Sequence, residues 1–370
     1  MNNSNQLYER YSRQIALKEF GEAGQQKLLQ AKVLVAGAGG LGCAALQYLA
    51  AAGIGNIGII DDDTVSLSNL HRQPLYTIKD IGLPKASTAA EKLRQLNPDV
   101  RITVYNERLT VANALEIIQE YDIILDGSDN FATRYMINDA CVLLNKPLVW
   151  GAVSRFEGQV AVFNVGLEKK GVPVNYRDLF PQPPADGEVA NCAETGVLGI
   201  LPGIIGTMQA GETIKLVTGI GKPLVNSLLT YNALNNQFFE LELVANNDTR
   251  NLVPANAAAF RATDYNWLCG ITENVFEIDN KQFNELRTKD NVLIIDVREP
   301  GELPVADGFK NISIPLGSIA ERFEDSVHDT IILFCQSGKR SLQAAKLLAG
   351  KWGNSKKIFS LAGGIVQWNP

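Results

Sequence analysis

Short, uninterrupted apolar runs alternate with longer mixed segments along the first part of the chain. The runs at 33–37 (VLVAG) and 56–61 (NIGIID) have the length and composition of strands that are buried on both faces. Between them, residues 41–53 (LGCAALQYLAAAG) have the length of a helix that ends at a glycine. The three segments therefore predict a strand, a helix and a second, parallel strand.

The same alternation continues as far as residue 153. The further helix and strand segments lie at about 85–96, 100–105, 112–121, 122–130, 138–146 and 147–153. Alternating elements of this kind predict an α/β fold with a mainly parallel, doubly wound sheet. Because such sheets bind ligands at the carboxyl ends of their strands, the polar residues that follow the strands are candidate site residues.

The pattern changes after Gly158. Residues 173–196 are rich in proline and glycine and contain few apolar residues. Long connections of this kind in compact domains are usually functional lids or disordered segments, and we expect a mobile crossover loop here. An apolar helix is predicted near 201–217.

A second, smaller α/β pattern begins near Val275. A segment of Asn, Ala and Thr at 246–263 separates it from the first region. We place the boundary near Gly270, which divides the chain into domains of residues 1–270 and 271–370.

The composition narrows the class of protein. Of the 370 residues, 46% are hydrophobic, and 34 Lys and Arg stand against 40 Asp and Glu, a net charge of −6. We therefore expect no nucleic-acid partner. The five cysteines form no C-x-x-C pair, which argues against a disulfide framework and indicates a reducing cytoplasm. The polar amino terminus lacks a secretory signal, and the uncharged stretch 33–60 has too many glycines for one membrane span, so we expect no membrane contact.

A glycine-rich turn joins the first strand to the first helix. Gly37, Gly39 and Gly42 have the spacing G-x-G-x-x-G, which is a weak signal by itself because it also occurs in loops that bind nothing. Asp61 ends the next strand, where a carboxylate can accept hydrogen bonds from ribose hydroxyls. We therefore expect a nucleotide at this edge of the sheet.

Two cations beyond the turn indicate that the ligand carries more negative charge than one pyrophosphate. Arg72 can contact phosphate oxygens through two donors, and Lys85 can add a compact charge. Each alone is better explained as a solvated surface cation, but together with the glycine turn they favour ATP over NAD. The sequence contains no Walker A motif, which excludes a P-loop ATPase.

Several separated motifs resemble the E1-like activating enzymes of the MoeB and ThiF type. They are RYSRQI (10–15), GAGGLG (37–42), DDDTVSLSNLHRQ (61–73), GLPKA (82–86) and LDGSDN (125–130), in the family's order within about residues 8–270. The resemblance implies ATP-dependent adenylylation of the C-terminal glycine of a ubiquitin-like sulfur-carrier protein of the MoaD or ThiS type. It also implies a homodimer.

The resemblance further assigns roles to individual residues. Asp61 would hold the ribose, Arg72 and Lys85 would contact the triphosphate, and Asp129 would position Mg²⁺. The other implied residues of the nucleotide site are Asn69 near the phosphates, Arg13 from the partner subunit, and Gly37, Gly39, Gly40, Gly42 and Asp63.

Cys192 lies in NCAETG (191–196), where members of the family have a loop that crosses the active site. In some of them this cysteine forms a bond to the carrier. The alternative is an ordinary loop thiol, and the sequence leaves both possibilities open.

One departure from the family concerns structural zinc, which these proteins usually bind through two C-x-x-C pairs. The matching places here hold Asn175, Asp178, Asn266 and Cys269. Because Asn with one Asp and one thiol makes a poor tetrahedral zinc set, we predict no structural zinc.

Cys335 follows the apolar run 330–334 and precedes a predicted helix. A thiol in that place faces loop amides and the positive end of a helix, which lower a thiol pKa, whereas a buried and inert cysteine is the alternative. With IDVRE (295–299) and LAGGIVQW (361–368), the loop from Cys335 to Arg340 resembles a rhodanese domain. The resemblance implies a persulfide on Cys335 and a loop fixed by Arg340, and four residues between the two favour sulfur over phosphate.

The two parts together predict one enzyme. The first domain adenylylates the carrier, and the Cys335 persulfide displaces AMP to give a thiocarboxylate for molybdopterin or thiamine biosynthesis or a related pathway. An NAD-dependent oxidoreductase is an alternative, but it leaves Arg72, Lys85 and the cysteine loop unexplained. A non-catalytic scaffold for carrier and sulfur donor agrees with the lost zinc thiols, although the phosphate-binding residues are all present.

Overall fold

The chain folds into two compact units, residues 1–265 and 266–370, in the computed structural model. The structure describes residues 3–166, 172–183, 196–268, 275–323, 326–352 and 356–368. The boundary predicted near Gly270 lies outside the described residues. Each unit has its own sheet and its own apolar core.

The described part of the first unit contains an eight-stranded sheet with the order β3-β2-β1-β4-β5-β6-β7-β8. Neighbours from β3 to β5 are parallel, whereas β5 to β8 are antiparallel. The prediction of a mainly parallel α/β sheet is therefore confirmed, with an antiparallel extension at one side. The strands are β1 (Lys32–Ala36), β2 (Asn56–Ile60), β3 (Arg101–Tyr105), β4 (Ile123–Asp126), β5 (Leu148–Ser154), β6 (Glu157–Phe163), β7 (Ser227–Asn232) and β8 (Gln237–Glu242).

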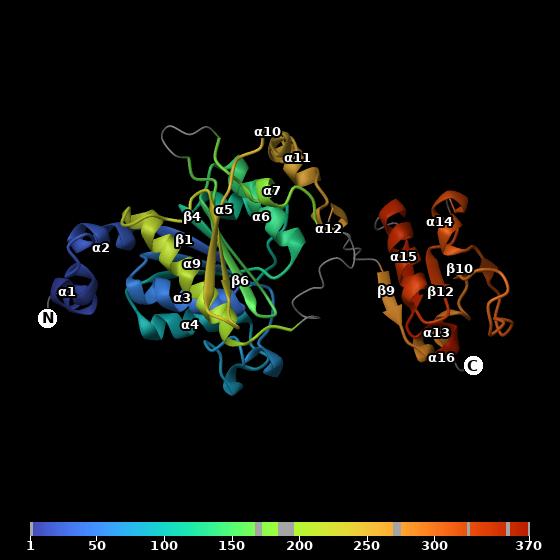
Figure 1. Ribbon diagram of the computed structural model, residues 1–370. Helices are drawn as coiled ribbons and strands as arrows, with labels where there is room; N and C mark the ends of the chain where they lie inside the picture. Colours follow the sequence, from blue (N-terminus) through green and yellow to red (C-terminus); the bar gives the residue numbers. More distant parts are fainter. Residues whose placement is uncertain are drawn as a thin grey trace. The chain divides into compact units, whose positions relative to one another are not determined.

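Several helices of this unit connect the strands on both sides of β1 (Figure 1). In the described residues the helices are α1 (Asn3–Ile15), α2 (Gly21–Gln30), α3 (Gly40–Ala52), α4 (Lys85–Leu96), α5 (Ala114–Gln119), α6 (Phe131–Leu143), α7 (Tyr176–Leu179), α9 (Ile200–Thr218), α10 (Asn247–Arg250) and α11 (Ala257–Ala262). A further helix, α12 (Tyr265–Leu268), crosses the boundary between the two units. Because α3 and α4 lead from β1 toward β3 while α5 and α6 lead back to β4 and β5, the winding reverses between β1 and β4. Doubly wound sheets bind ligands at this reversal.

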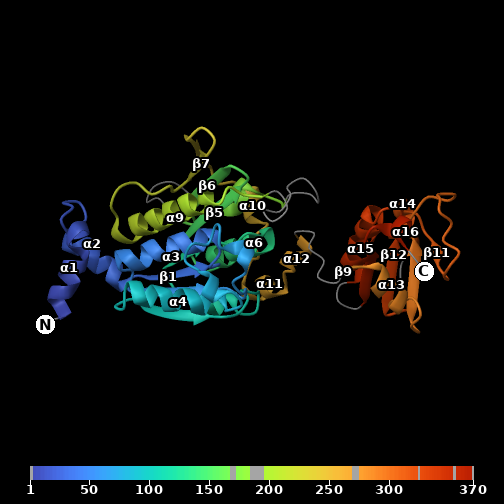
Figure 2. The same cartoon turned by 90° about the horizontal axis from the view of Figure 1, so that it is seen from below.

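Glycines allow α3 to approach its neighbours closely. Gly37 follows β1 directly and has a φ of +94°, and a Cβ on Gly42 would lie 1.9 Å from the Gly37 carbonyl oxygen. A Cβ on Gly206 in α9 would lie 2.2 Å from the Leu41 carbonyl oxygen. Figures 1 and 2 show α3 and α9 side by side along the sheet. The third glycine of the predicted turn therefore serves packing, because no side chain fits there.

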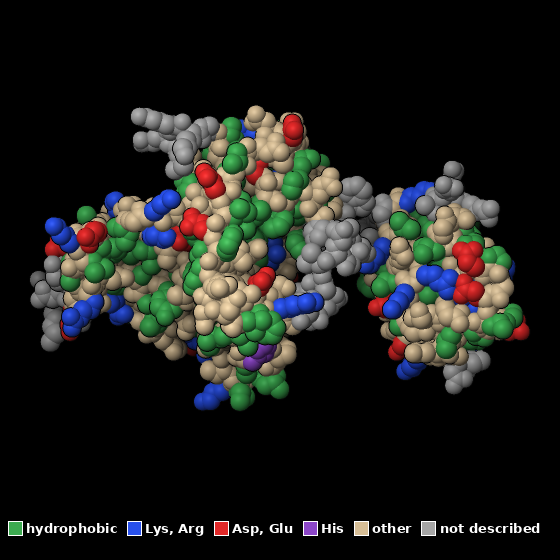
Figure 3. All heavy atoms as spheres, viewed as in Figure 1, with side chains coloured by type: hydrophobic (Ala, Val, Ile, Leu, Met, Phe, Trp, Pro, Cys, Tyr) green, Lys and Arg blue, Asp and Glu red, His purple; other side chains and the backbone are tan. Residues whose placement is uncertain are grey.

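The uncharged stretch 33–60 folds as β1, α3 and β2, as predicted, and not as one long helix. Among the described residues, no helix combines the length with the apolar character that a membrane crossing requires. On the faces that Figure 3 shows, acidic and basic side chains are interspersed, in keeping with the net charge of −6.

Residues 173–180, which the sequence assigned to the start of a mobile loop, are packed into the first unit. α7 places Tyr176 and Arg177 in the core, where they are 1% and 3% exposed. The Tyr176 ring lies 5.4 Å from that of Trp150, and Arg177 Nη2 lies 2.7 Å from Asp139 Oδ2. These contacts to distant parts of the chain anchor the segment, which its proline-rich composition could not show. Residues 184–195 lie outside the described part.

The segment 246–263, expected to separate the two regions, folds onto the first unit as α10 and α11. Phe260 is fully buried, and the Thr249 hydroxyl donates to the Asp178 carboxylate. Beyond this segment, the Tyr265 hydroxyl donates to Asp139 Oδ2 at 2.7 Å. The chain therefore belongs to the first core as far as Tyr265.

The buried Asp139 and Arg177 pair allows a stability prediction. Arg177→Ala leaves the Asp139 carboxylate buried with its bidentate partner removed, so the free energy of unfolding of the first unit should fall by ~3–5 kcal/mol. Urea denaturation followed by circular dichroism measures the change. Arg261→Ala is the matched control, because its pair with Glu116 is exposed and 3.9 Å long and should contribute about 1 kcal/mol or less. Equal effects of the two variants would contradict the role of the buried pair.

The second unit is built on a parallel sheet of five strands, within the residues that the structure describes, in the order β11-β10-β12-β13-β9. The strands are β9 (Val275–Ile278), β10 (Val292–Asp296), β11 (Ile312–Ser313), β12 (Thr330–Phe334) and β13 (Lys357–Leu361). Its helices are α13 (Asn280–Leu286), α14 (Leu316–Arg322), α15 (Lys339–Trp352) and α16 (Gly364–Gln367). One apolar cluster contains Ile331 and Leu333 and a second contains Ile332 and Phe334, so alternate residues of β12 fill the cores on the two faces of the sheet.

Candidate functional site

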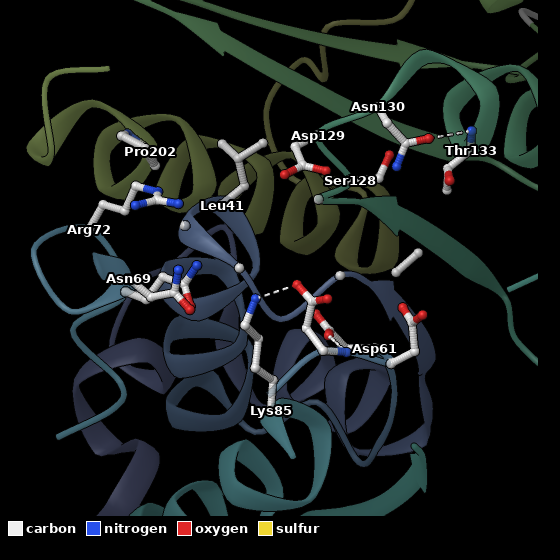
Figure 4. Close-up of a pocket in the computed structure, with 18 of the residues that line it drawn as sticks. Leu41, Asp61, Asn69, Arg72, Lys85, Ser128, Asp129, Asn130, Thr133 and Pro202 are labelled. Atoms are coloured by element: carbon white, nitrogen blue, oxygen red, sulfur yellow. Dashed lines mark hydrogen bonds and ion pairs between the residues drawn. The ribbon is translucent and has the colours of Figure 1, made fainter. Parts of the chain in front are cut away.

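A cavity of about 790 Å³ opens at the carboxyl ends of β1, β2 and β4. This volume is within the range of small-molecule sites. Its lining includes most of the predicted nucleotide-site residues, and Figure 4 shows Arg72, Asn69 and Lys85 facing Asp129 across the space. The predicted residues that line the cavity are Gly37, Gly39, Gly40, Asp61, Asp63, Asn69, Arg72, Lys85 and Asp129.

Asp61 is held in place by backbone amides. Its Oδ2 accepts from the Ala38 amide at 2.7 Å, and its Oδ1 accepts from the Asp63 amide at 2.8 Å. Burial raises the pKa of the Asp61 carboxyl, although the Ala38 amide and Lys85 act in the opposite direction. The first of these bonds ties the end of β2 to the glycine turn, so the carboxylate faces any ligand that occupies the turn.

The two predicted cations reach the cavity from different elements. Lys85 begins α4, is 6% exposed in its side chain, and pairs with Asp63 at 2.7 Å. Arg72 follows the short 3₁₀ helix η1 (Leu67–Asn69), and its Nη1 donates to the Ser68 carbonyl at 2.9 Å. A cation that is buried with one exposed carboxylate can exchange that partner for a phosphate oxygen without moving far.

The turn after β4, with Asp129, and the capped start of α6 form the opposite wall. Ser128 donates its amide to Asp126 Oδ1 at 2.9 Å, and Asn130 caps α6 by accepting from the Thr133 amide at 2.9 Å. These bonds fix the turn after β4, where Asp129 is exposed toward the cavity. Within the described residues, no cation or hydrogen-bond donor contacts the Asp129 carboxylate, so it can serve as one oxygen ligand of a hard cation such as Mg²⁺.

Three neighbouring carboxylates offer a second place for a metal. Ligand atoms of Asp61, Asp62 and Asp63 lie within 4.8 Å of one another. However, Asp61 already accepts two amide bonds and Asp63 already pairs with Lys85. Asp129 therefore remains the better candidate.

Two buried polar side chains of the cavity were not predicted. Gln73 is 3% exposed, and its Oε1 has no hydrogen-bond partner in the described residues. Arg134 in α6 is 6% exposed and donates through Nη2 to the Ser128 carbonyl at 3.2 Å. Gln73 follows Arg72 directly and could have been suspected from that. No sequence pattern pointed to Arg134, because only the packing of α6 brings it to the cavity.

Two predicted residues of the nucleotide site, Gly42 and Arg13, do not line the cavity. Gly42 lies inside α3, where it serves packing, and Arg13 is exposed on α1. Cys192 lies outside the described residues. The roles proposed for Arg13 and Cys192 therefore remain predictions.

Two of the four places that match the family's zinc ligands, Asn175 and Asp178, form a hydrogen-bonded turn. Asp178 Oδ2 accepts from the amide and the side-chain nitrogen of Asn175, at 2.8 and 3.0 Å. Asp178 Oδ1 accepts from the Asn246 amide and the Thr249 hydroxyl. Both oxygens of this carboxylate are thus already bonded, so the turn does not fit zinc, and the absence of structural zinc remains a prediction. Cys269 lies outside the described residues.

In the second unit, Cys335 lies in the loop between β12 and α15. Its Sγ accepts from the Gly338 amide at 3.2 Å, and the Ser341 hydroxyl lies 3.6 Å from it. Burial raises the pKa of the Cys335 thiol, but bonds from the Ser341 hydroxyl and from the amides of Ser341, Ser337 and Gly338 outweigh burial and lower the pKa below its ordinary value. The geometry therefore favours a thiolate over an inert thiol.

The end of the chain packs onto this loop. The Ile365 amide donates to the Cys335 carbonyl at 2.8 Å, and a Cβ on Gly364 would lie 2.5 Å from the same oxygen. Gly364 has a φ of +65°. Gly364 of LAGGIVQW is therefore needed for close approach to the cysteine loop.

Arg340 lies in the first turn of α15, directly after this loop, and pairs with a residue that the sequence did not single out. Its Nη1 and Nη2 donate to the two carboxylate oxygens of Glu302, each at 2.6 Å. The structure gives these bonds to Glu302 and none to the loop, so a role of Arg340 in fixing the loop stays a prediction.

Comparisons with known proteins cover both units. A model of the ThiF family matches residues 11–253, and a model of the rhodanese-like domain matches residues 279–370. A probable adenylyltransferase/sulfurtransferase MoeZ of Mycobacterium tuberculosis is 40% identical over 370 residues, with 97% of this chain and 92% of the relative covered. A sulfur carrier protein adenylyltransferase of Thermus thermophilus is 49% identical over 263 residues, with 71% and 97% covered.

The fold also matches solved structures. A crystal structure of E. coli MccB with ATP has a TM-score of 0.55 and 22% identity, with 67% of this chain and 73% of that chain covered. At this identity the match shows a shared fold and nothing further.

Proposed function

Because the chain belongs to the ThiF family, we propose that its first unit transfers AMP from ATP to the terminal carboxylate of a small sulfur-carrier protein. Relatives matched over 97% of this chain are named adenylyltransferase and sulfurtransferase, and this chain is an enzyme of that kind. The observation that carries the proposal is the 790 Å³ cavity in which the glycine turn, Arg72, Lys85 and Asp129 meet.

The first step needs alignment and charge neutralisation more than a protein nucleophile. A carboxylate oxygen of the carrier attacks the α-phosphorus of ATP, the bond from that phosphorus to the bridging oxygen breaks, and pyrophosphate leaves. The amino-terminal end of α3 directs amides at the phosphates, and Asp61 accepts from the ribose hydroxyls. Arg72 and Lys85 neutralise the triphosphate. Magnesium, when held by Asp129, would add to that neutralisation.

In the second step, sulfur carried by Cys335 replaces AMP. The terminal sulfur of the Cys335 persulfide attacks the acyl carbon of the adenylate, and AMP leaves. A second thiol then attacks the Cys335 sulfur, which releases the carrier thiocarboxylate and leaves a disulfide on Cys335. The hydrogen bonds from Gly338 and Ser341 support this role, because they stabilise negative charge on sulfur.

The partner proteins follow from the same proposal. The carrier would be ubiquitin-like, of the MoaD or ThiS type, and would serve molybdopterin or thiamine biosynthesis. The exposed position of Arg13 on α1 agrees with a homodimer in which Arg13 enters the partner's site. A reducing cytoplasm remains the expected location, since the Cys335 thiolate must stay free.

Exchange of labelled pyrophosphate into ATP, with the full chain and candidate carriers, tests the first step. We expect exchange that depends on a carrier ending in glycine. Mass spectrometry of the carrier after addition of a sulfur donor should then show one oxygen replaced by sulfur. Absence of exchange with every cognate carrier would reject adenylation. Tighter binding of NAD than of ATP would instead favour the oxidoreductase alternative.

A further inference from the structure

Both arginines beside the Cys335 loop are already neutralised by carboxylates. Arg340 pairs with Glu302 through two bonds of 2.6 Å, and Arg298 Nη2 lies 2.6 Å from Asp296 Oδ2. Bidentate pairs of this kind are among the stronger charged hydrogen bonds in proteins. The loop that carries the reactive sulfur is therefore poor in unpaired positive charge from arginine.

The pair between Arg340 and Glu302 persists at any pH at which sulfur transfer is measured. Hydrogen bonds from Arg340 and from the Glu299 amide lower the pKa of the Glu302 carboxyl to about 2. Glu302 therefore remains ionised, and Arg340 keeps its partner. Lys339, which begins α15 beside Arg340, is exposed to solvent, where its charge is screened.

The chain segment after Glu302 is apolar and exposed. Leu303 and Val305 have 70% and 67% of their surface accessible. A hydrated dianion gains nothing from such a surface, whereas an alkyl group can pack against it. The charge and the surface near Arg340 thus point to the same kind of sulfur donor.

We propose that Glu302 determines donor specificity: by holding Arg340 it removes the charge that a dianionic donor such as thiosulfate needs, and so selects an alkyl persulfide, which carries one negative charge or none. This inference rests on the proposed function of Cys335 as the sulfur carrier.

Sulfur transfer to Cys335 is the same displacement reaction with either donor. The Cys335 thiolate attacks the terminal sulfur of the donor RS–SH, a new sulfur–sulfur bond forms on Cys335, and the donor bond breaks to release the thiolate RS⁻. With thiosulfate the leaving group is sulfite. Thiosulfate has to bring two negative charges beside a thiolate, so it depends far more on an available cation.

The test compares hydroxyethyl persulfide with thiosulfate as donors to the full chain. In Glu302→Gln, the KM for thiosulfate should fall by about tenfold, while kcat/KM for the persulfide changes by less than about twofold. Glu299→Gln removes an equal charge from an exposed site three residues away and should change neither value. Glu302→Asp keeps the negative charge and should remain selective for the persulfide. Equal changes with both donors, or an unchanged thiosulfate KM, would overturn the proposal.

A binding measurement separates this proposal from the function of Cys335. Equilibrium dialysis of ³⁵S-labelled thiosulfate with full-length Cys335→Ser, with and without Glu302→Gln, requires no turnover. The Glu302→Gln change should tighten thiosulfate binding by about tenfold. If binding tightens but the native chain transfers sulfur from neither donor, the carrier role of Cys335 fails while the role of Glu302 stands. If binding does not change, the role of Glu302 fails.

Discussion

Arg72→Ala is expected to slow adenylation by ~10²-fold or more, as loss of a preorganised charge at a reacting phosphate does. Arg72 lines the cavity, and only its Nη1 is engaged, by the Ser68 carbonyl and the His71 ring. The other guanidinium nitrogens have no partner in the described residues and are available for phosphate oxygens. Carrier-dependent exchange of pyrophosphate into ATP measures the loss.

Two further variants define what Arg72 contributes. Arg72→Lys keeps the charge but loses the planar fork, so exchange should fall by less than in Arg72→Ala without returning to the native rate. Arg101→Ala removes an exposed arginine at the start of β3, at the opposite edge of the sheet, and should leave exchange unchanged. Near-native exchange by Arg72→Ala would show that Arg72 does not contact the reacting phosphates.

Cys335→Ala is expected to abolish formation of the carrier thiocarboxylate while pyrophosphate exchange continues at the native rate. The thiol is the atom that carries sulfur, whereas the adenylation cavity is formed entirely by residues of the first unit. Persulfide on the chain, detected by mass spectrometry after incubation with a donor, and thiocarboxylate on the carrier are the two readouts. Loss of exchange in this variant would show that the two activities are not separable in this way.

Cys141→Ala is the control, because Cys141, among the described residues, lacks the hydrogen bonds that lower the pKa of the Cys335 thiol. Cys141 is fully buried in α6, and burial raises its pKa well above the ordinary value. It should therefore carry no persulfide, and its loss should leave both activities at native levels per folded molecule. If sulfur transfer persists in Cys335→Ala and disappears in Cys141→Ala, the assignment of Cys335 as the sulfur carrier is wrong.

Local sequence patterns were sufficient to predict the helices and strands that surround the site. The helix predicted at 85–96 is α4, and the apolar runs before Gly37 and Asp61 are the buried strands β1 and β2. Such runs are readable because the side-chain period of an element is set by neighbouring residues. The hairpin of β7 and β8 was not predicted, since the β8 side chains are exposed and follow no alternation of buried and exposed positions.

Contacts between residues far apart in the sequence could not be predicted from local patterns. Asp139 and Arg177 are separated by 38 residues, as are Glu302 and Arg340, and nothing in either local pattern specifies the partner. Arg134 reaches the cavity for the same kind of reason, through the packing of α6. Where several arginines and carboxylates are available, only the folded arrangement decides which of them meet.

The sequence by itself determined the α/β class, the glycine turn with Asp61, Arg72 and Lys85, and the cysteine loop, because each depends on residue types at short spacings. Only the tertiary structure decided that one cavity brings Arg72 and Lys85 opposite Asp129, that α7 is anchored, and that Glu302 neutralises Arg340. These relations depend on how separate elements pack, which is a property of the whole fold and of no single segment.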